Sequence, residues 1–250
     1  MDIKKILLEF LSYPLNSSDE IFKRFSTIPN SKLFIGNKPG ERFLFIEGNR
    51  EDAATLVAHA DTVFNNVGQH DIIEDEDFFI SGNPNYGIGA DDRAGCAMVW
   101  LLKDLGHHLL ICDYEESTHP DAFGCCTGSK FLINEHKDVA KTINDSSFIF
   151  EFDRRLAYGI RKEHYTCYNL PVSKEFRNFI ETNTGFIDDD NSGFTDILVL
   201  CKDVCGANIC VGYANAHTPA EKISISAFIN TYEIMLKLLS QKLNRFPLIK

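Results

Sequence analysis

Residues 87–95, which read Gly-Ile-Gly-Ala-Asp-Asp-Arg-Ala-Gly, constrain this chain more than any other stretch. They precede the apolar run 96–102, and this order predicts a buried helix that begins near Arg93. Glycine and alanine let a backbone approach other groups closely, and a helix N-terminus favours negative charge. The stretch therefore predicts a tight loop that brings the carboxylates of Asp91 and Asp92 to the start of a buried helix.

This acid pair has two interpretations. Either aspartate can cap the helix, which is the ordinary role of an acid before an apolar run. Alternatively, the pair belongs to a functional site, in which case further polar residues should end other apolar segments.

The strand-like segment 54–63 contains such residues, because His59 and Asp61 follow its apolar run. Residues i and i+2 of a strand point to the same face, so the Asp61 carboxylate can reach the His59 ring. An acid that fixes a histidine ring is typical of a metal-bound histidine. A simple hydrogen-bonded histidine at a strand end is the alternative.

Three more strand-like segments lead into acids or a histidine. Residues 109–114 precede Glu115 and Glu116, 147–153 end in Asp153, and 208–213 lead to His217. Polar groups at the carboxyl ends of parallel strands gather at one edge of a sheet. Several carboxylates cannot converge without compensation, and two divalent metal ions provide it. The sequence predicts a two-metal site with a spare acid as general base.

The remaining pattern predicts the fold class. Helical spacing occurs over 3–11, 19–26, 129–135, 171–183 and from 224 or 226 to 243. Further strands are expected at 32–37, 42–47 and 197–200, with a solvated acidic hairpin over 70–81. Alternation of this kind predicts an α/β fold: three layers, a mixed but mainly parallel sheet, and helices on both faces. We expect one domain over 1–250, with an N-terminal helical segment at about 1–28.

Composition excludes several classes of partner. The net charge of −11 argues against a nucleic-acid partner, which needs a basic surface. No apolar run is long enough to cross a membrane, and the charged N-terminal segment is not a signal peptide. The eight cysteines show no disulfide spacing, so we expect a cytoplasmic protein in which Cys125 and Cys126 are small packed residues.

At these residues the chain resembles the co-catalytic zinc exopeptidases, which include the M20, M28 and M42 metallopeptidases. The 59–63 stretch His-Ala-Asp-Thr-Val is similar to an M20 signature, and the 90–95 stretch Ala-Asp-Asp-Arg-Ala-Gly is closer to M42. The resemblance implies a zinc exopeptidase-like fold and two divalent ions, zinc first, with cobalt or manganese as alternatives. It places His59 and Asp153 on one metal, Glu116 and His217 on the other, and Asp91 between them.

The same resemblance assigns the remaining roles. Glu115 becomes the general base, Asp61 orients His59, and the peptide bond between Asp91 and Asp92 becomes cis. M20 enzymes insert a lid domain between their last acidic ligand and last histidine, but here a helix and two strands already fill that interval. We therefore expect a compact form without a lid, in which Tyr213 is a candidate oxyanion donor. The segment 117–123, with His119, is longer than the usual family link.

These expectations describe a hydrolase of amide bonds, first of all an aminopeptidase that acts on small peptides. A carboxypeptidase, a dipeptidase, an N-acyl amino acid deacylase and a non-catalytic metal- or peptide-binding relative are the alternatives. The sequence leaves the oligomeric state open. Candidate partners for a substrate amino group are Asp92, Asp189, Asp190 and Asp196, and candidates for a substrate carboxylate are Arg154, Arg155 and Arg161.

Overall fold

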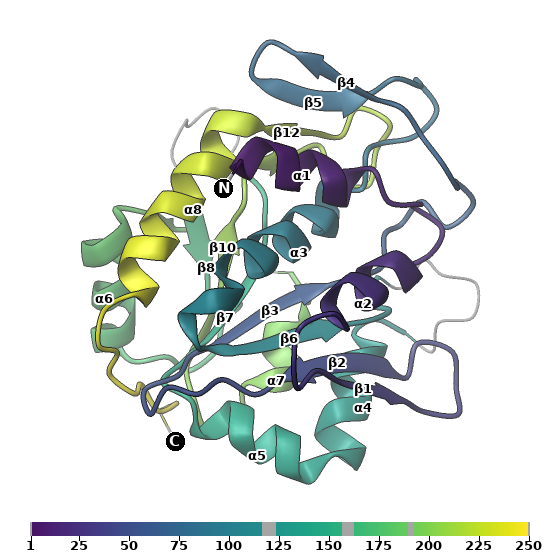
Figure 1. The fold of residues 1–250 in the computed structure, drawn as a ribbon. Coiled ribbons are helices and arrows are strands. Elements are labelled where there is room, and N and C mark those ends of the chain that lie inside the picture. The colour runs from purple at the N-terminus through teal and green to yellow at the C-terminus, as the bar shows by residue number, and fades with distance from the viewer. Residues whose placement is uncertain (1, 117–123, 157–162, 190–192, 250) are drawn as a thin grey trace.

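An eight-stranded mixed sheet forms the centre of the computed structural model, which describes residues 2–116, 124–156, 163–189 and 193–249. The strand order is β1-β2-β6-β3-β7-β10-β8-β9 (Figure 1). The strands are β1 (Lys32–Ile35), β2 (Arg42–Ile46), β3 (Thr55–His59), β6 (His108–Cys112), β7 (Ile149–Arg154), β8 (His164–Thr166), β9 (Ile187–Asp188) and β10 (Gly206–Cys210).

The middle of this sheet is parallel. Strand β3 pairs in parallel with β6 and β7, and β7 pairs in parallel with β10. Antiparallel pairs join β1 to β2, β2 to β6 and β8 to β10. The carboxyl ends of β6, β3, β7 and β10 therefore meet along one edge of the sheet, as the sequence predicted.

Helices cover both faces of the sheet and complete three layers (Figure 1). One face carries α1 (Ile3–Leu11), α2 (Asp19–Phe25), α3 (Ala90–Leu102), α6 (Lys174–Thr184) and α8 (Ile225–Leu239). The other carries α4 (Thr127–Glu135), α5 (Lys137–Asp145) and α7 (Asp196–Leu200). A short 3-10 helix, η1 (Lys103–Leu105), follows α3. Each face buries a separate apolar core against the sheet.

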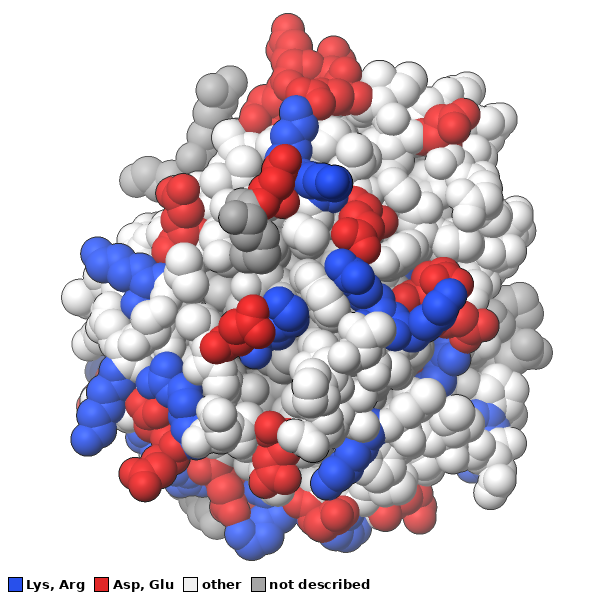
Figure 2. Space-filling model, viewed as in Figure 1, with Lys and Arg blue, Asp and Glu red and all other residues white. Residues whose placement is uncertain are grey.

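The acidic hairpin belongs to a second, antiparallel sheet with the order β11-β12-β5-β4. Its strands are β4 (Ile72–Asp75), β5 (Phe78–Ser81), β11 (Tyr213–Ala214) and β12 (Lys222–Ser224). Figure 2 shows acidic side chains gathered at the hairpin tip, where Glu74, Asp75 and Glu76 are exposed. Asp77 instead accepts hydrogen bonds from Ser224 and from the Ser226 backbone at the start of α8. The hairpin is solvated at its tip but attached at its base.

Several predicted elements need correction. Residues 197–200 form helix α7 and not a strand, because Ile197 and Leu200, three positions apart, pack into the same core. The C-terminal helix ends at Leu239 and not near 243. Helix α5 and strands β8, β9 and β12 have no counterpart in the prediction, and the strand expected over 208–213 divides into β10, which ends at Cys210, and β11, which begins at Tyr213. No helix within the described residues is long and apolar enough to cross a membrane.

Candidate metal centre

Six acids and histidines meet at the carboxyl edge of the parallel strands. His59 is the last residue of β3, Asp153 lies near the end of β7, and Glu115 and Glu116 follow β6. Asp91 comes from the first turn of α3, and His217 follows β11. All but His217 are at least nine-tenths buried. The structure thus brings together every residue that the sequence nominated as a metal ligand or general base.

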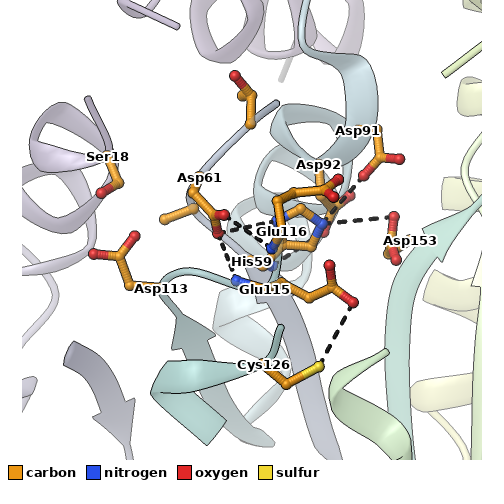
Figure 3. Close-up of polar contacts among 12 residues, drawn as sticks. Ser18, His59, Asp61, Asp91, Asp92, Asp113, Glu115, Glu116, Cys126 and Asp153 are labelled. Atoms are coloured by element: carbon orange, nitrogen blue, oxygen red, sulfur yellow. Dashed lines mark hydrogen bonds and ion pairs between the residues drawn. The ribbon is translucent and has the colours of Figure 1, made fainter. Parts of the chain in front are cut away.

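The first group of possible ligands surrounds the His59 ring. Its Nε2 lies 3.1 Å from Asp91 Oδ1 and 3.8 Å from Asp153 Oδ1 (Figure 3). Ligand atoms of these three residues all lie within 4.8 Å of one another. They can therefore contact one ion together.

The second group forms around His217. Its Nε2 lies 3.0 Å from Asp91 Oδ2 and 2.7 Å from Glu116 Oε1. These three residues again keep their ligand atoms within 4.8 Å. Asp91 belongs to both groups, with one oxygen directed to each histidine, which is the arrangement of a bridging carboxylate.

The sequence left two roles open for Asp91 and Asp92, a helix cap and a functional-site acid. In the structure each residue takes one of these roles. Both have non-helical backbone angles, and the peptide bond between them is cis. Asp91 faces the histidines, whereas the carboxylate of Asp92 accepts hydrogen bonds from the backbone N–H of Gly95 (2.8 Å) and of His59 (3.1 Å). Asp92 therefore caps the regular part of α3 and also ties it to the end of β3.

Asp61 connects His59 with the two glutamates. Its Oδ1 lies 3.4 Å from His59 Nδ1 and also accepts a hydrogen bond from the Glu115 N–H (3.0 Å). Its Oδ2 accepts one from the Glu116 N–H (3.1 Å). One carboxylate thus orients the ring of His59 and fixes the backbone of the loop after β6 (Figure 3).

Glu115 is held next to a thiol that sequence reasoning did not connect with it. The Sγ of Cys126 lies 3.7 Å from Glu115 Oε1, and the Cys126 N–H donates to the Glu115 main-chain oxygen (2.9 Å). The thiol is buried at the start of α4 (Figure 3). Apart from the unusual adjacency of Cys125 and Cys126, no residue pattern indicates this contact.

While no metal is bound, protons on the histidines and acids offset the negative charge of the cluster. Hydrogen bonds with Asp91 and Glu116 raise the pKa of His217 to about 11. Burial opposes protonation of His59, but hydrogen bonds to Asp153, Asp61 and Asp91 outweigh it and raise its pKa well above the usual range. Burial, reinforced by the charge of Asp91, raises the pKa of Asp153 to about 7.

The donor set fits two divalent cations. Imidazole nitrogens and carboxylate oxygens, in two groups with one shared acid, suit zinc and its neighbours in the transition series. Burial raises the pKa of Glu115 well above its usual range, and the charge of Glu116 adds to the effect. A buried acid with such a pKa can hold and transfer a proton near neutral pH.

A cavity of about 240 Å³ opens at this cluster. The side chains of Asp91, Glu115, Glu116, Asp153 and His217 contribute to its lining, together with Arg154, Arg155, Tyr168, Phe194 and Tyr213. The Tyr213 hydroxyl lies 2.9 Å from Asp153 Oδ1 and 3.0 Å from the Asp153 main-chain oxygen. Tyr213 therefore supports Asp153 at the wall of the cavity.

Three of the four acids considered for a substrate amino group are described by the structure, and none of these three lines this cavity. Asp92 is buried in the cap of α3, Asp196 is buried near α4 and β6, and Asp189 pairs with Arg154 and lies 3.2 Å from His164 Nε2. Asp190, Arg161 and the segment 117–123 with His119 lie outside the described residues.

Sequence reasoning missed Glu221, which positions Asp91. Its buried carboxylate accepts hydrogen bonds from the N–H groups of Ile88 (2.9 Å), Gly89 (2.6 Å) and Asp91 (3.2 Å). Gly89 has a φ of +64°, which glycine adopts without strain. The position of Glu221 four residues after His217 was the available signal, but nothing in the sequence shows that the two segments meet.

Comparison with known proteins extends the description of the fold. No family model and no curated protein matches the sequence. Among solved structures, aminopeptidase PepT from Bacillus cereus superposes with a TM-score of 0.66 at 12% identity, over 95% of this chain and 98% of that one. A tripeptidase from Staphylococcus aureus gives 0.63 at 12% identity, over 96% and 98%. The TET1 peptidase of Pyrococcus horikoshii gives 0.63 at 12% identity, over 97% and 100%. The chain shares the fold of these peptidases, and the fold expected from the resemblance is confirmed.

Proposed function

We propose that this protein is a metal-dependent hydrolase of amide bonds, and first of all an aminopeptidase that acts on small peptides. One observation carries the proposal: two groups of metal ligands share Asp91, with a separate buried acid, Glu115, beside them in the same cavity. The shared fold supports the choice of an amide substrate, because two solved neighbours that span almost the whole chain are described as an aminopeptidase and a tripeptidase.

Each residue has a role in this account. His59 and Asp153 hold one ion, Glu116 and His217 hold the other, and Asp91 contacts both. Bound divalent cations supply positive charge that polarises the scissile carbonyl group and acidifies a water molecule. The Glu115 carboxylate accepts the proton from water and transfers it to the leaving amine nitrogen. Through its three contacts, Asp61 holds the loop of Glu115 and the ring of His59 in fixed positions relative to each other.

The setting of the reaction is also part of the proposal. Zinc is the preferred metal, because the ligand set mixes imidazole with carboxylate. A reducing, cytoplasmic environment agrees with the eight cysteines, none of which forms a disulfide bond in the structure. The chain acts as a single catalytic domain without a lid, so its substrate reaches the metals from an open cavity.

A conservative substitution of the base tests the proposal. Glu115→Gln keeps the size of the side chain but cannot accept the proton, so we expect full metal content and a loss of about 10²- to 10⁴-fold in kcat. The assay measures release from aminoacyl anilides and N-acyl amino acids before and after chelation. The exposed Glu135→Gln on α4 is the control and should behave as wild type. Undiminished hydrolysis in the Glu115 variant contradicts the assigned base. If the wild-type protein binds metal but hydrolyses none of these substrates, a non-catalytic protein is favoured.

A further inference from the structure

Glu115 is held at three points, and two of these fix its backbone. Its N–H donates to Asp61 Oδ1 (3.0 Å), and its main-chain oxygen accepts a hydrogen bond from the Cys126 N–H (2.9 Å). The N–H groups of the first two residues of α4 bind the main-chain oxygens of Tyr114 and Asp113 in the same way, both at 2.9 Å. The start of α4 therefore lies alongside the segment after β6 and keeps a fixed distance from it.

The third point is the Glu115 carboxylate itself. Cys126 Sγ lies 3.7 Å from Glu115 Oε1, and the thiol is fully buried. Figure 3 shows the second carboxylate oxygen of Glu115 pointing away from the sulfur, toward the side on which His59 and Asp153 lie. The two oxygens thus have different surroundings: Oε1 meets the thiol, and Oε2 faces the metal ligands.

The thiol acts as the donor in this contact. Burial, to which the charges of Asp196 and Glu115 add, raises the pKa of the Cys126 thiol well above its usual range, so the sulfur keeps its proton. A thiol is a weak donor, but a bond to an ionised acceptor is stronger than a bond to a neutral one. The contact is therefore strongest when Glu115 is ionised, which is the state in which a general base acts.

The backbone at Cys126 also indicates a role for its side chain. Its φ is +55°, in the left-handed region that residues with a side chain adopt rarely and at a cost. Glycine adopts this conformation without that cost. The contact with Glu115 explains why a side chain occupies this position.

We propose that Cys126 is a positioning residue for the general base: its thiol holds Oε1 of Glu115, so that Oε2 receives the proton from water and passes it to the leaving amine nitrogen. Cys126 keeps its own proton throughout and is not among the described residues that line the cavity. This inference rests on the proposed function and adds a residue that acts on the reaction through Glu115.

Kinetics of three variants test this role. Cys126→Ala removes the donor, so kcat for an aminoacyl anilide should fall by about 3- to 10-fold, the value of one weak hydrogen bond, with KM and zinc content unchanged. Cys126→Ser places an O–H donor on the same Cβ and should recover most of this loss. Cys125→Ala is the matched control: it removes the adjacent thiol, which makes no described contact with Glu115, and should behave as wild type. Equal losses in the alanine and serine variants, or a loss confined to KM, would overturn the proposal.

Infrared spectroscopy tests the contact without any hydrolysis. The difference spectrum between wild type and Cys126→Ala isolates the S–H stretching band of Cys126. Glu115→Gln replaces the carboxylate with an uncharged, weaker acceptor, so the band should move to higher frequency. The exposed Glu135→Gln should leave the band in place.

The outcomes separate this inference from the proposed function. A band that does not move in Glu115→Gln, in a protein that hydrolyses the anilide, overturns the role of Cys126 and leaves the proposed function intact. Failure of wild type to hydrolyse any of the substrates overturns the proposed function and, with it, the role of Cys126.

Discussion

His217 and His59 each lie between carboxylates, and these neighbours govern the protonation of both rings before metal binds. His217 lies within 3.0 Å of two acids, and His59 lies within 3.8 Å of three. The same acids raise the pKa of both rings, which favours the positively charged, doubly protonated imidazolium form while no metal is bound. Metal coordination requires neutral imidazole, so ions and protons compete for the same atoms.

Metal affinity should therefore rise with pH. His217, with a pKa of about 11, is protonated throughout the neutral range, and Asp153, with a pKa of about 7, is partly protonated. Loading both sites at pH 7 should release more than one proton per chain, and affinity should increase from pH 6 to pH 9. Calorimetric titration with zinc in buffers of different ionisation enthalpy measures both quantities. Binding that releases no protons and does not vary with pH would show that the acids and histidines do not share protons as described.

The sequence indicated individual site residues where each ended an apolar segment. His59, Asp153 and the two glutamates could be found in this way because strand ends share one edge of a parallel sheet. Glu221 could not be found, because it contacts Ile88, Gly89 and Asp91 from 130 or more residues away in the sequence. Cys126 is only 11 residues from Glu115, but no residue pattern indicates that their side chains meet. A carboxylate that accepts hydrogen bonds from backbone N–H groups cannot be recognised from the residue types of its partners, because every residue except proline has such a group.

Helix α3 is the element that holds Asp91 in place. Arg93 in its first turn is fully buried, and its guanidinium donates to the main-chain oxygens of Ala60 (2.6 Å), Pro14 (2.9 Å) and Ser17 (2.9 Å). These bonds join the helix to the segment after β3 and to the connection between α1 and α2. Glu221 fixes the loop on the other side of Asp91, so Asp91 lies between two anchored segments.

Gly95 allows this packing, and its substitution should disturb it. A Cβ at Gly95 would collide with both carboxylate oxygens of Asp92 and with the main-chain oxygen of Phe152. Gly95→Ala should lower the free energy of unfolding by about 1–3 kcal/mol, the usual cost of overpacking, and should weaken metal binding near His59. Gly68→Ala is the control, because its Cβ would meet only Asn16 Oδ1 at 4.0 Å and should change stability by less than about 0.5 kcal/mol. Urea denaturation measures both, and equal stability of the two variants would contradict the packing argument.

Helices and strands could be predicted from the sequence where their run of apolar residues was long and not interrupted by polar residues. Helix α3 and strands β3, β6 and β7 met this condition. Residues 197–200 did not, since four apolar residues suit a buried strand and a buried helix equally well. The Thr195 hydroxyl and the Ile197 N–H both contact Glu151 Oε2 (2.7 and 3.2 Å), which places a carboxylate at the start of helix α7. That stabilising contact comes from β7 and is invisible in the local sequence.

Across the whole molecule, the centre joins segments from most of the chain. Its residues come from β3, α3, β7 and the segments after β6 and β11, and Asp91 connects His59 with His217. The resemblance seen at five short motifs therefore corresponds to one spatial cluster on a peptidase fold. The sequence could indicate the layers and the edge of the sheet that carries the site. Of the second sheet it indicated only the hairpin over 70–81, because β11 and β12 are too short to show a periodic pattern.

Counting the bound metal tests the central claim, that Asp91 bridges two ions, most directly. Elemental mass spectrometry after zinc saturation and removal of free metal should find two ions per wild-type chain. His217→Ala should retain one, because His59, Asp91 and Asp153 remain, and Asp91→Ala should lose both, with circular dichroism used to verify that the variants fold. One ion or none in the saturated wild type, or two in Asp91→Ala, would contradict the two-metal centre.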